Sequence, residues 1–271
     1  MKKFFSFVTI ALLTFVLAAC QGGNDKKEEN KLVIGASNVP HAEILEQAKP
    51  ILEKEGIELE IETFQEFILP NKALDQKEID ANYYQHKPFF EKQIKEHGYD
   101  FEDAGGIHIE PIGIYSKNYK KLEDVKDGAT VIISNSVADH GRILLLLQEK
   151  GLITLKEGKT IDASFEDIEK NPKNLTFKYD INPELLPKVY ENNEGDLVII
   201  NSNFALDAGL NPLKDAIAIE DENSPYVNIV AVRKGDADDK RIQKLIEVLH
   251  SKEIQDWIVE KYEGAVVPVD K

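Results

Sequence analysis

The chain has 271 residues, of which 42% are hydrophobic and 30% are charged, so it is long enough for one large globular domain or two modest lobes. Its formal net charge of −16 would repel a phosphate backbone, which excludes nucleic acid as a partner.

The first 19 residues are typical of a secretory signal. Two lysines precede an apolar run over residues 4–19, which is too short to span a bilayer as a mature helix. The run ends in the sequence LAAC, whose last residue is Cys20, and this ending resembles the lipobox of bacterial lipoprotein precursors. We therefore expect a signal peptide over 1–19 and lipid on Cys20. The alternative is an ordinary cleaved signal followed by an accidental cysteine.

Residues 20–30 are polar and cannot bury enough apolar surface to fold, which predicts a flexible tether. One acyl chain anchors a protein only weakly, so stable attachment implies at least two chains, such as palmitate, on Cys20. Because Cys20 is the only cysteine, we expect no internal disulfide.

The body begins with a strand–helix–strand pattern. Residues 31–37 form a short apolar run suited to a buried strand, and a one-sided apolar row follows from Pro40 to Leu52. Gly56 ends this helix, and residues 57–63 then alternate between apolar and acidic side chains. A βαβ unit of this length predicts a parallel sheet.

The alternation of strands and helices continues to the end of the chain. Further strands are expected at 107–116, 130–134, 175–179, 197–201 and 227–233, and helices at 139–150, 183–192 and 238–262, the last broken near Ser251. Segments 111–117 and 227–234 are similar strand-like sequences. The stretch between them has its own alternation of strands and helices. A second lobe inserted between two crossings would explain this pattern, and one continuous doubly wound sheet is the alternative.

Sequence motifs of enzymes do not occur in the chain. It contains no nucleophile elbow, phosphate-binding loop, dinucleotide-binding glycine motif or zinc-binding HExxH. The six histidines are scattered, and no two have the spacing of metal ligands on one helix. We therefore expect no catalytic residue, no metal and no cofactor.

Residues 80–90 carry four aromatic side chains and a histidine. One interpretation is a buried corner at which Pro88 begins a helix. The other is an aromatic box for an apolar or thioether side chain, because sulfur makes favourable contacts with aromatic rings.

Polar residues follow several predicted strands. Ser136 is a candidate N-cap with Asp139 as its acidic partner, and Arg142 would lie in the second turn, able to reach a carboxylate with two nitrogens. The alternative for Arg142 is an ordinary ion pair. Asn201, Asn203 and Asn228 also lie at strand ends, where they would cap turns or orient the polar head of an amino acid.

Several strings of residues, in this order, resemble the NlpA-type methionine-binding lipoproteins, also called MetQ-type, through nearly all of the mature chain. They are the lipobox, PHAEIL at 40–45, residues 80–88, IEPIGIYS at 109–116, Gly141-Arg142, NPKNL at 171–175, residues 201–212 and Ser224-Pro225-Tyr226.

The resemblance implies an α/β protein with a two-lobed periplasmic-binding-protein fold of the type II-like class, each lobe a mainly parallel sheet flanked by helices. Residues 31–112 plus 229–271 would form the first lobe and 113–228 the second. It also implies a monomeric, non-enzymatic protein that is lipid-anchored outside the cytoplasm. Such a protein delivers methionine to the permease and ATPase subunits of an ABC importer.

Carried over by position, the resemblance assigns Phe67, Tyr84 and His86 to the side-chain pocket and Arg142 to the ligand carboxylate. Asn203 and Asn228 would hold the polar head. The chain departs from the common family pattern at three places on the expected cleft wall, namely Phe67, residues 134–136 and residues 139–140. A methionine-containing dipeptide, another small amino acid, or an adhesion role without a transport ligand therefore remain as alternatives.

Overall fold

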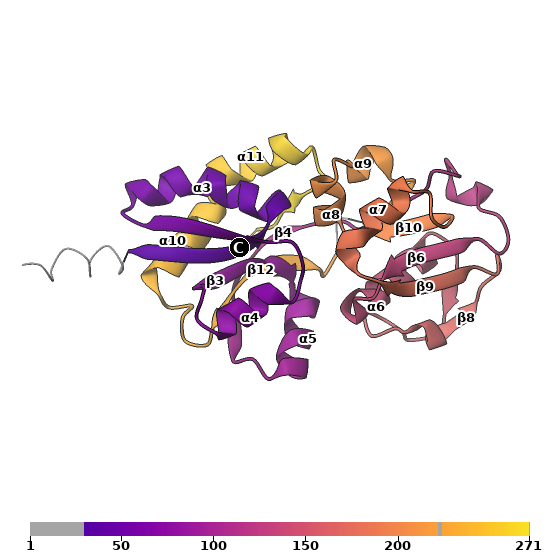
Figure 1. Cartoon of the computed structure of the whole chain (residues 1–271), viewed down its shortest axis with the longest axis horizontal. Coiled ribbons are helices and arrows are strands. Elements are labelled where there is room, and N and C mark those ends of the chain that lie inside the picture. The colour runs from indigo at the N-terminus through magenta and orange to yellow at the C-terminus, as the bar shows by residue number, and fades with distance from the viewer. Residues whose placement is uncertain (1–29, 222–223, 271) are drawn as a thin grey trace, which may run out of the picture.

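A computed structural model describes residues 30–221 and 224–270. The expected signal peptide, the lipid site at Cys20 and nearly all of the expected tether lie outside these residues. Figure 1 shows two lobes side by side along the long axis of the molecule, each built on its own sheet. Within the described ranges, no helix combines the length and apolarity that crossing a bilayer requires.

The first lobe contains a six-stranded sheet with the order β13-β4-β12-β3-β1-β2. Its strands are β1 (Lys31–Ser37), β2 (Glu58–Phe64), β3 (Ala81–His86), β4 (Phe101–Ile109), β12 (Val227–Arg233) and β13 (Val267–Pro268). The predicted βαβ unit is confirmed, since β1 pairs with β2 in parallel from Lys31 opposite Glu58 to Ser37 opposite Phe64.

Helices cover both faces of this sheet (Figure 1). One face packs against α3 (Glu43–Lys54), α10 (Lys240–Leu249) and α11 (Lys252–Tyr262), and the other against α4 (Leu69–Asp75) and α5 (Lys87–His97). A single π-helical turn, η1 (Asn38–Ala42), joins β1 to α3. The break predicted near Ser251 is confirmed, because the Ser251 hydroxyl accepts a bond from the amide of Ile254 and starts α11.

The second lobe contains a five-stranded sheet with the order β11-β5-β10-β6-β9. Its strands are β5 (Gly113–Tyr115), β6 (Thr130–Ser134), β9 (Thr176–Ile181), β10 (Leu197–Ile200) and β11 (Ala218–Ile219), with a small pair β7 (Thr154–Leu155) and β8 (Ile168–Lys170) beside it. The helical elements are η2 (Leu122–Asp124), α6 (Val137–Glu149), η3 (Phe165–Asp167), η4 (Pro183–Leu185), α7 (Leu186–Glu191), α8 (Ser202–Asp207) and α9 (Pro212–Asp215).

The α/β class and the two-lobed architecture are confirmed, and most strands of each sheet run in one direction, although both sheets also contain antiparallel strands. In the first lobe, β1 is parallel to β2 and β3, whereas β12 is antiparallel to β3 and β4. In the second, β6 is parallel to β9 and β10, whereas β5 is antiparallel to β10 and β11. By β5 the chain enters the second lobe and by β12 it returns to the first, and β13 is also antiparallel to its neighbour β4.

The chain passes between the lobes twice. It leaves β4 at Ile109 and enters β5 at Gly113, and it returns from β11 to β12. The segment 107–116, expected as one strand, is therefore two strands in different sheets. Asn228, which the expected boundary placed in the second lobe, lies in β12 because it pairs with His86 and His108 of the first sheet.

Candidate functional site

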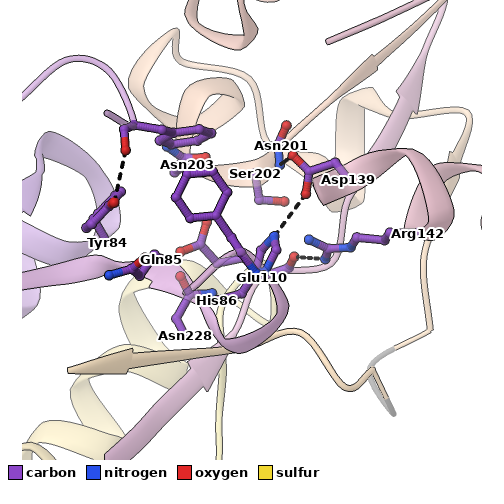
Figure 2. Close-up of a pocket in the computed structure, with 12 residues that line it drawn as sticks. Tyr84, Gln85, His86, Glu110, Asp139, Arg142, Asn201, Ser202, Asn203 and Asn228 are labelled. Atoms are coloured by element: carbon purple, nitrogen blue, oxygen red, sulfur yellow. Dashed lines mark hydrogen bonds and ion pairs between the residues drawn. The ribbon is translucent and has the colours of Figure 1, made fainter. Parts of the chain in front are cut away.

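A cavity lies between the two lobes and encloses about 400 Å³, part of it open to solvent. Figure 2 shows side chains from both lobes converging on it. The lining residues are Phe67, Tyr84, Gln85, His86, Phe89, Glu110, Asp139, Arg142, Asn201, Ser202, Asn203 and Asn228.

Three aromatic rings form one end of the cavity. The ring centroids of Phe67, Tyr84 and Phe89 are 6.2, 5.9 and 6.3 Å apart in the three pairs, so no two of them are stacked face to face. The Tyr84 hydroxyl donates to the backbone oxygen of Phe67 at 2.9 Å, which holds the Phe67 loop over this end (Figure 2). The arrangement offers apolar ring faces to a flexible side chain, and a thioether sulfur suits such surroundings.

Phe67 also joins the lobes. It lies in the loop between β2 and α4, and its ring contacts Phe204 of α8 with a centroid distance of 4.8 Å. This contact covers the aromatic end of the cavity from the second lobe. The residues around Phe67 have no periodic pattern, so the sequence placed it in the site only through the family resemblance.

His86 and Asp139 connect the lobes at the polar end. The backbone amide of Phe89 donates to His86 Nδ1 at 3.1 Å, so the other ring nitrogen, Nε2, carries the proton. That nitrogen donates to Asp139 Oδ1 at 2.9 Å, from β3 to α6 (Figure 2). Burial acts to raise the pKa of Asp139, but the hydrogen bond from His86 and the charge of Arg142 outweigh it, and the pKa is lowered.

Arg142 lines the cavity from α6 and is only 3% exposed. Its Nε lies 3.1 and 3.0 Å from the two carboxylate oxygens of Glu220, and its Nη2 donates to the backbone oxygen of Glu110 at 2.6 Å. The guanidinium lies over the Tyr226 ring at 4.5 Å. Among the described residues, Nη1 has no hydrogen-bond partner. Two nitrogens of Arg142 thus contact Glu220, and Nη1 is the remaining one, while the expected contact with a ligand carboxylate stays a prediction.

Acceptors lie at the same polar end. Glu110 is 6% exposed, and burial raises the pKa of its carboxyl, with His41 and Arg142 offsetting part of the effect. Asn201 donates to Asp139 at 3.4 Å, and its own Oδ1 is buried without a hydrogen-bond partner among the described residues. The donors of Arg142 and the acceptors on Glu110, Asp139 and Asn201 together suit a ligand group that carries a positive and a negative charge.

Directly behind the cavity, His41, His108 and Glu110 form a buried cluster whose possible ligand atoms lie within 4.8 Å of one another. Both Nε2 atoms face the same oxygen of Glu110, at 3.2 Å from His41 and 2.8 Å from His108. These are hydrogen-bond distances, and the outer nitrogens contact the hydroxyls of Ser37 and Tyr83. The cluster has the residue types of a metal site, but its polar atoms are already paired with one another.

All six residues predicted for ligand binding, Phe67, Tyr84, His86, Arg142, Asn203 and Asn228, line this one cavity. What each contributes to binding stays a prediction. The aromatic box suggested at residues 80–90 includes Phe89, whereas the sequence did not assign Gln85, Glu110 or Ser202 to the site. Glu110 did carry a signal, because it is an acid between two apolar strands and precedes the proline at the crossing.

One local expectation was wrong. Ser136 occupies the N-cap position of α6, but its side chain makes no capping hydrogen bond. The expected partner, Asp139, is instead engaged by His86 from the other lobe and by Asn201. A contact between the lobes has replaced the local one.

The two buried histidines predict that stability falls in acid. Burial lowers the pKa of His41 to about 4 and that of His108 to about 3, whereas an unfolded histidine titrates near ~6.5. Between these values the unfolded chain binds more protons, so the free energy of unfolding falls by about 1.4 kcal/mol per pH unit for each histidine. Urea unfolding between pH 7 and 4 should show this slope, and His108→Phe should reduce it.

The comparison with the variant is needed because the raised pKa of Glu110 acts in the opposite direction in acid. A change at His97, which is exposed at the end of α5, serves as the control and should leave the wild-type slope intact. Parallel profiles for wild type and His108→Phe would contradict the assignment.

The fold and the cavity define the class as a two-lobed ligand-binding protein whose site lies between the lobes. Comparison with known proteins agrees. The model of the NlpA lipoprotein family matches residues 32–270, and the chain belongs to this family.

Two curated relatives and one solved structure illustrate the similarity. The methionine-binding lipoprotein MetQ of Bacillus subtilis is 50% identical over 276 residues, covering all of both chains. The D-methionine-binding lipoprotein MetQ of Escherichia coli is 35% identical over 266 residues, covering 98% of each. A nutrient binding protein from Burkholderia cenocepacia, solved bound to methionine, is 37% identical with a TM-score of 0.83, covering 88% of this chain and all of the other. The periplasmic-binding fold expected from the sequence is thereby confirmed.

Proposed function

We propose that the protein captures methionine, or a close derivative, between its lobes as the substrate-binding lipoprotein of an ABC importer. The observation that carries this proposal is the two-ended cavity. Three aromatic rings line one end, and the guanidinium of Arg142 with the acceptors Glu110 and Asp139 lines the other. A zwitterionic head with an unbranched thioether side chain matches both ends. The relatives named for methionine support the same ligand.

The same proposal covers partners and place in the cell. Permease and ATPase subunits would receive the ligand, and lipid on Cys20 would hold the protein, as a monomer, to the outer face of the cell membrane. The protein would act by binding alone. In support, the cavity's charged groups are tied to one another rather than arranged as a nucleophile beside a base: His86 donates to Asp139, and Arg142 pairs with Glu220.

Ligand-induced thermal stabilisation tests the function. A ligand that binds only the folded state stabilises it by about 2.7 kcal/mol at a concentration 100 times its dissociation constant. Methionine should therefore raise the melting temperature in a concentration-dependent manner, whereas aspartate and lysine should not. If only a methionine-containing dipeptide stabilised the protein, the ligand would be that dipeptide and not free methionine. If no amino acid or peptide stabilised it, an adhesion role would be favoured.

The Tyr84→Ala variant should lose more affinity for methionine than for the ligands alanine or glycine. The change removes one ring of the aromatic end, together with the hydroxyl that holds the Phe67 loop. Calorimetry should show a loss of at least tenfold for methionine, or about 1.4 kcal/mol. Tyr84→Phe is the matched control, because it keeps the ring and removes only the hydroxyl. An equal loss for all three ligands would remove Tyr84 from the side-chain pocket.

A further inference from the structure

We propose that His41, which does not line the cavity, is a positioning residue that turns the amide of Asn228 so that its NH₂ group faces the ligand's carboxylate. This inference rests on the proposed function, because it concerns how the amino-acid head is oriented. His41 lies in η1 and is 1% exposed, with its ring edge-on to that of Tyr83 at 4.6 Å. Two of its partners, Asn228 and Glu110, line the cavity, and Asn228 is the one whose orientation its ring can determine.

The surroundings of His41 determine which of its ring nitrogens carries the proton. Nε2 lies 3.1 Å from Asn228 Oδ1 and 3.2 Å from Glu110 Oε1. On the other side of the ring, Nδ1 lies 2.6 Å from the Ser37 hydroxyl, which is able to donate. A neutral ring with the proton on Nε2 satisfies all of these contacts at once.

The neighbouring histidine supports the same assignment. The Tyr83 hydroxyl is hydrogen-bonded to His108 Nδ1, and burial raises the pKa of Tyr83 well above its ordinary value, so this hydroxyl keeps its proton and is able to donate. With Tyr83 as the donor to Nδ1, the proton of His108 lies on Nε2, which donates to Glu110 Oε1 at 2.8 Å. A carboxyl oxygen that accepts from His108 is also an acceptor towards His41, so Nε2 of His41 is a donor.

The donor at His41 fixes the amide of Asn228. An N–H group requires an oxygen opposite it, so Oδ1 of Asn228 faces His41 and the NH₂ group faces away. Asn228 lines the cavity, and within the described residues its Nδ2 has no hydrogen-bond partner. The Nδ2 group of Asn228 is therefore a hydrogen-bond donor at the cavity wall. Nη1 of Arg142 is a second donor without a partner, and both suit a ligand carboxylate. Without His41, the amide is free to rotate and to present its oxygen to that carboxylate.

Two matched substitutions test the role of His41. His41→Phe and His108→Phe each keep a buried ring and remove one donor to Glu110, but only the first removes the contact with Asn228. Binding of methionine is compared with that of methioninol, which keeps the ammonium and lacks the carboxylate. We expect the preference for methionine over methioninol to fall at least fivefold in His41→Phe and less than twofold in His108→Phe. Equal changes in the two variants would overturn the proposal.

A double variant tests whether His41 acts through Asn228. Asn228→Ala should lower the same preference, and His41→Phe added to Asn228→Ala should lower it no further, because the amide to be oriented is gone. Additive losses would show that His41 acts by another route and would overturn the assignment.

The tautomer of His41 is measurable without any ligand. Nitrogen-15 spectra of the wild-type protein should show His41 neutral at pH 7 with its proton on Nε2, the signal being assigned by its loss in His41→Phe. A proton on Nδ1 would reverse the amide and overturn the proposal, even if methionine binds. Tight binding of one Zn²⁺ per chain, lost in both histidine variants, would overturn it in favour of a metal site. Failure of wild type to bind methionine, with the Nε2 tautomer present, would instead count against the proposed function.

Discussion

Replacing Arg142 by alanine is expected to weaken methionine binding at least tenfold, or about 1.4 kcal/mol, in calorimetry of the folded protein. Nη1 is the nitrogen of Arg142 that is left for a ligand carboxylate. The same guanidinium holds Glu220 through Nε and the backbone of Glu110 through Nη2. Its removal would leave the ligand carboxylate, Glu220 and Glu110 close together in a buried site without the guanidinium. Losses of this kind are large because the remaining charges stay desolvated.

The matched control is Arg241→Ala. Arg241 also forms a two-nitrogen pair, with Asp239, but it lies at the start of α10 and does not line the cavity. Its loss should leave affinity unchanged. Glu220→Gln keeps the guanidinium of Arg142 and removes the negative charge that neutralises it. This variant should not weaken methionine binding. If Arg142→Ala bound methionine as well as Arg241→Ala does, the carboxylate would not lie at Arg142.

The second large effect is expected at Gly141, one residue before Arg142. A Cβ built on Gly141 would lie 2.0 Å from the backbone oxygen of Ile161 and 2.6 Å from its carbonyl carbon. Backbone atoms cannot turn aside as a side chain can, so helix α6 or the 161 loop must move. Overpacking typically costs about 1–3 kcal/mol, and we expect Gly141→Ala to lower the free energy of unfolding by ~3 kcal/mol in urea titrations.

Gly105→Ala is the control for this change. The nearest atoms to its added Cβ are side-chain carbons of Ile246 at 3.2 and 3.3 Å, which can move by a few tenths of an ångström. We expect a loss of about 1 kcal/mol or less. Equal urea midpoints for the two variants would show that α6 is not held against the 161 loop as described. Any Gly141→Ala protein that folds should also bind methionine more weakly, because α6 carries Arg142.

Local patterns in the sequence predicted much of the fold. The βαβ start, the strand at 227–233 and the division of the last helix at Ser251 all follow from periodicity, glycine and capping signals that act within a few residues. The strand β3 was not predicted. It is fully buried yet contains Asn82 and Gln85, which are satisfied by Asn71 in α4 through a network of amide hydrogen bonds. Polar residues in a buried strand become intelligible only when their distant partners are known.

The candidate site shows the same limit. Arg142 was identified from its position after a strand, but its partner Glu220 is 78 residues away, and no local pattern predicted their pairing. Asp139 was read as a local cap and is bound by His86, 53 residues earlier. Residue types and strand ends thus indicated where the cavity lies, whereas the direction of each hydrogen bond depended on contacts between the lobes.

The most direct test is a crystal structure of the protein starting at Cys20, grown with L-selenomethionine. The chain's only methionine is Met1, so this form contains none, and every anomalous selenium signal must come from the ligand. We predict one selenium position in the cavity, about 5 Å from the rings of Phe67, Tyr84 and Phe89, with the ligand carboxylate at Arg142. A cavity without selenium, or a selenium position outside the cleft, would contradict the account.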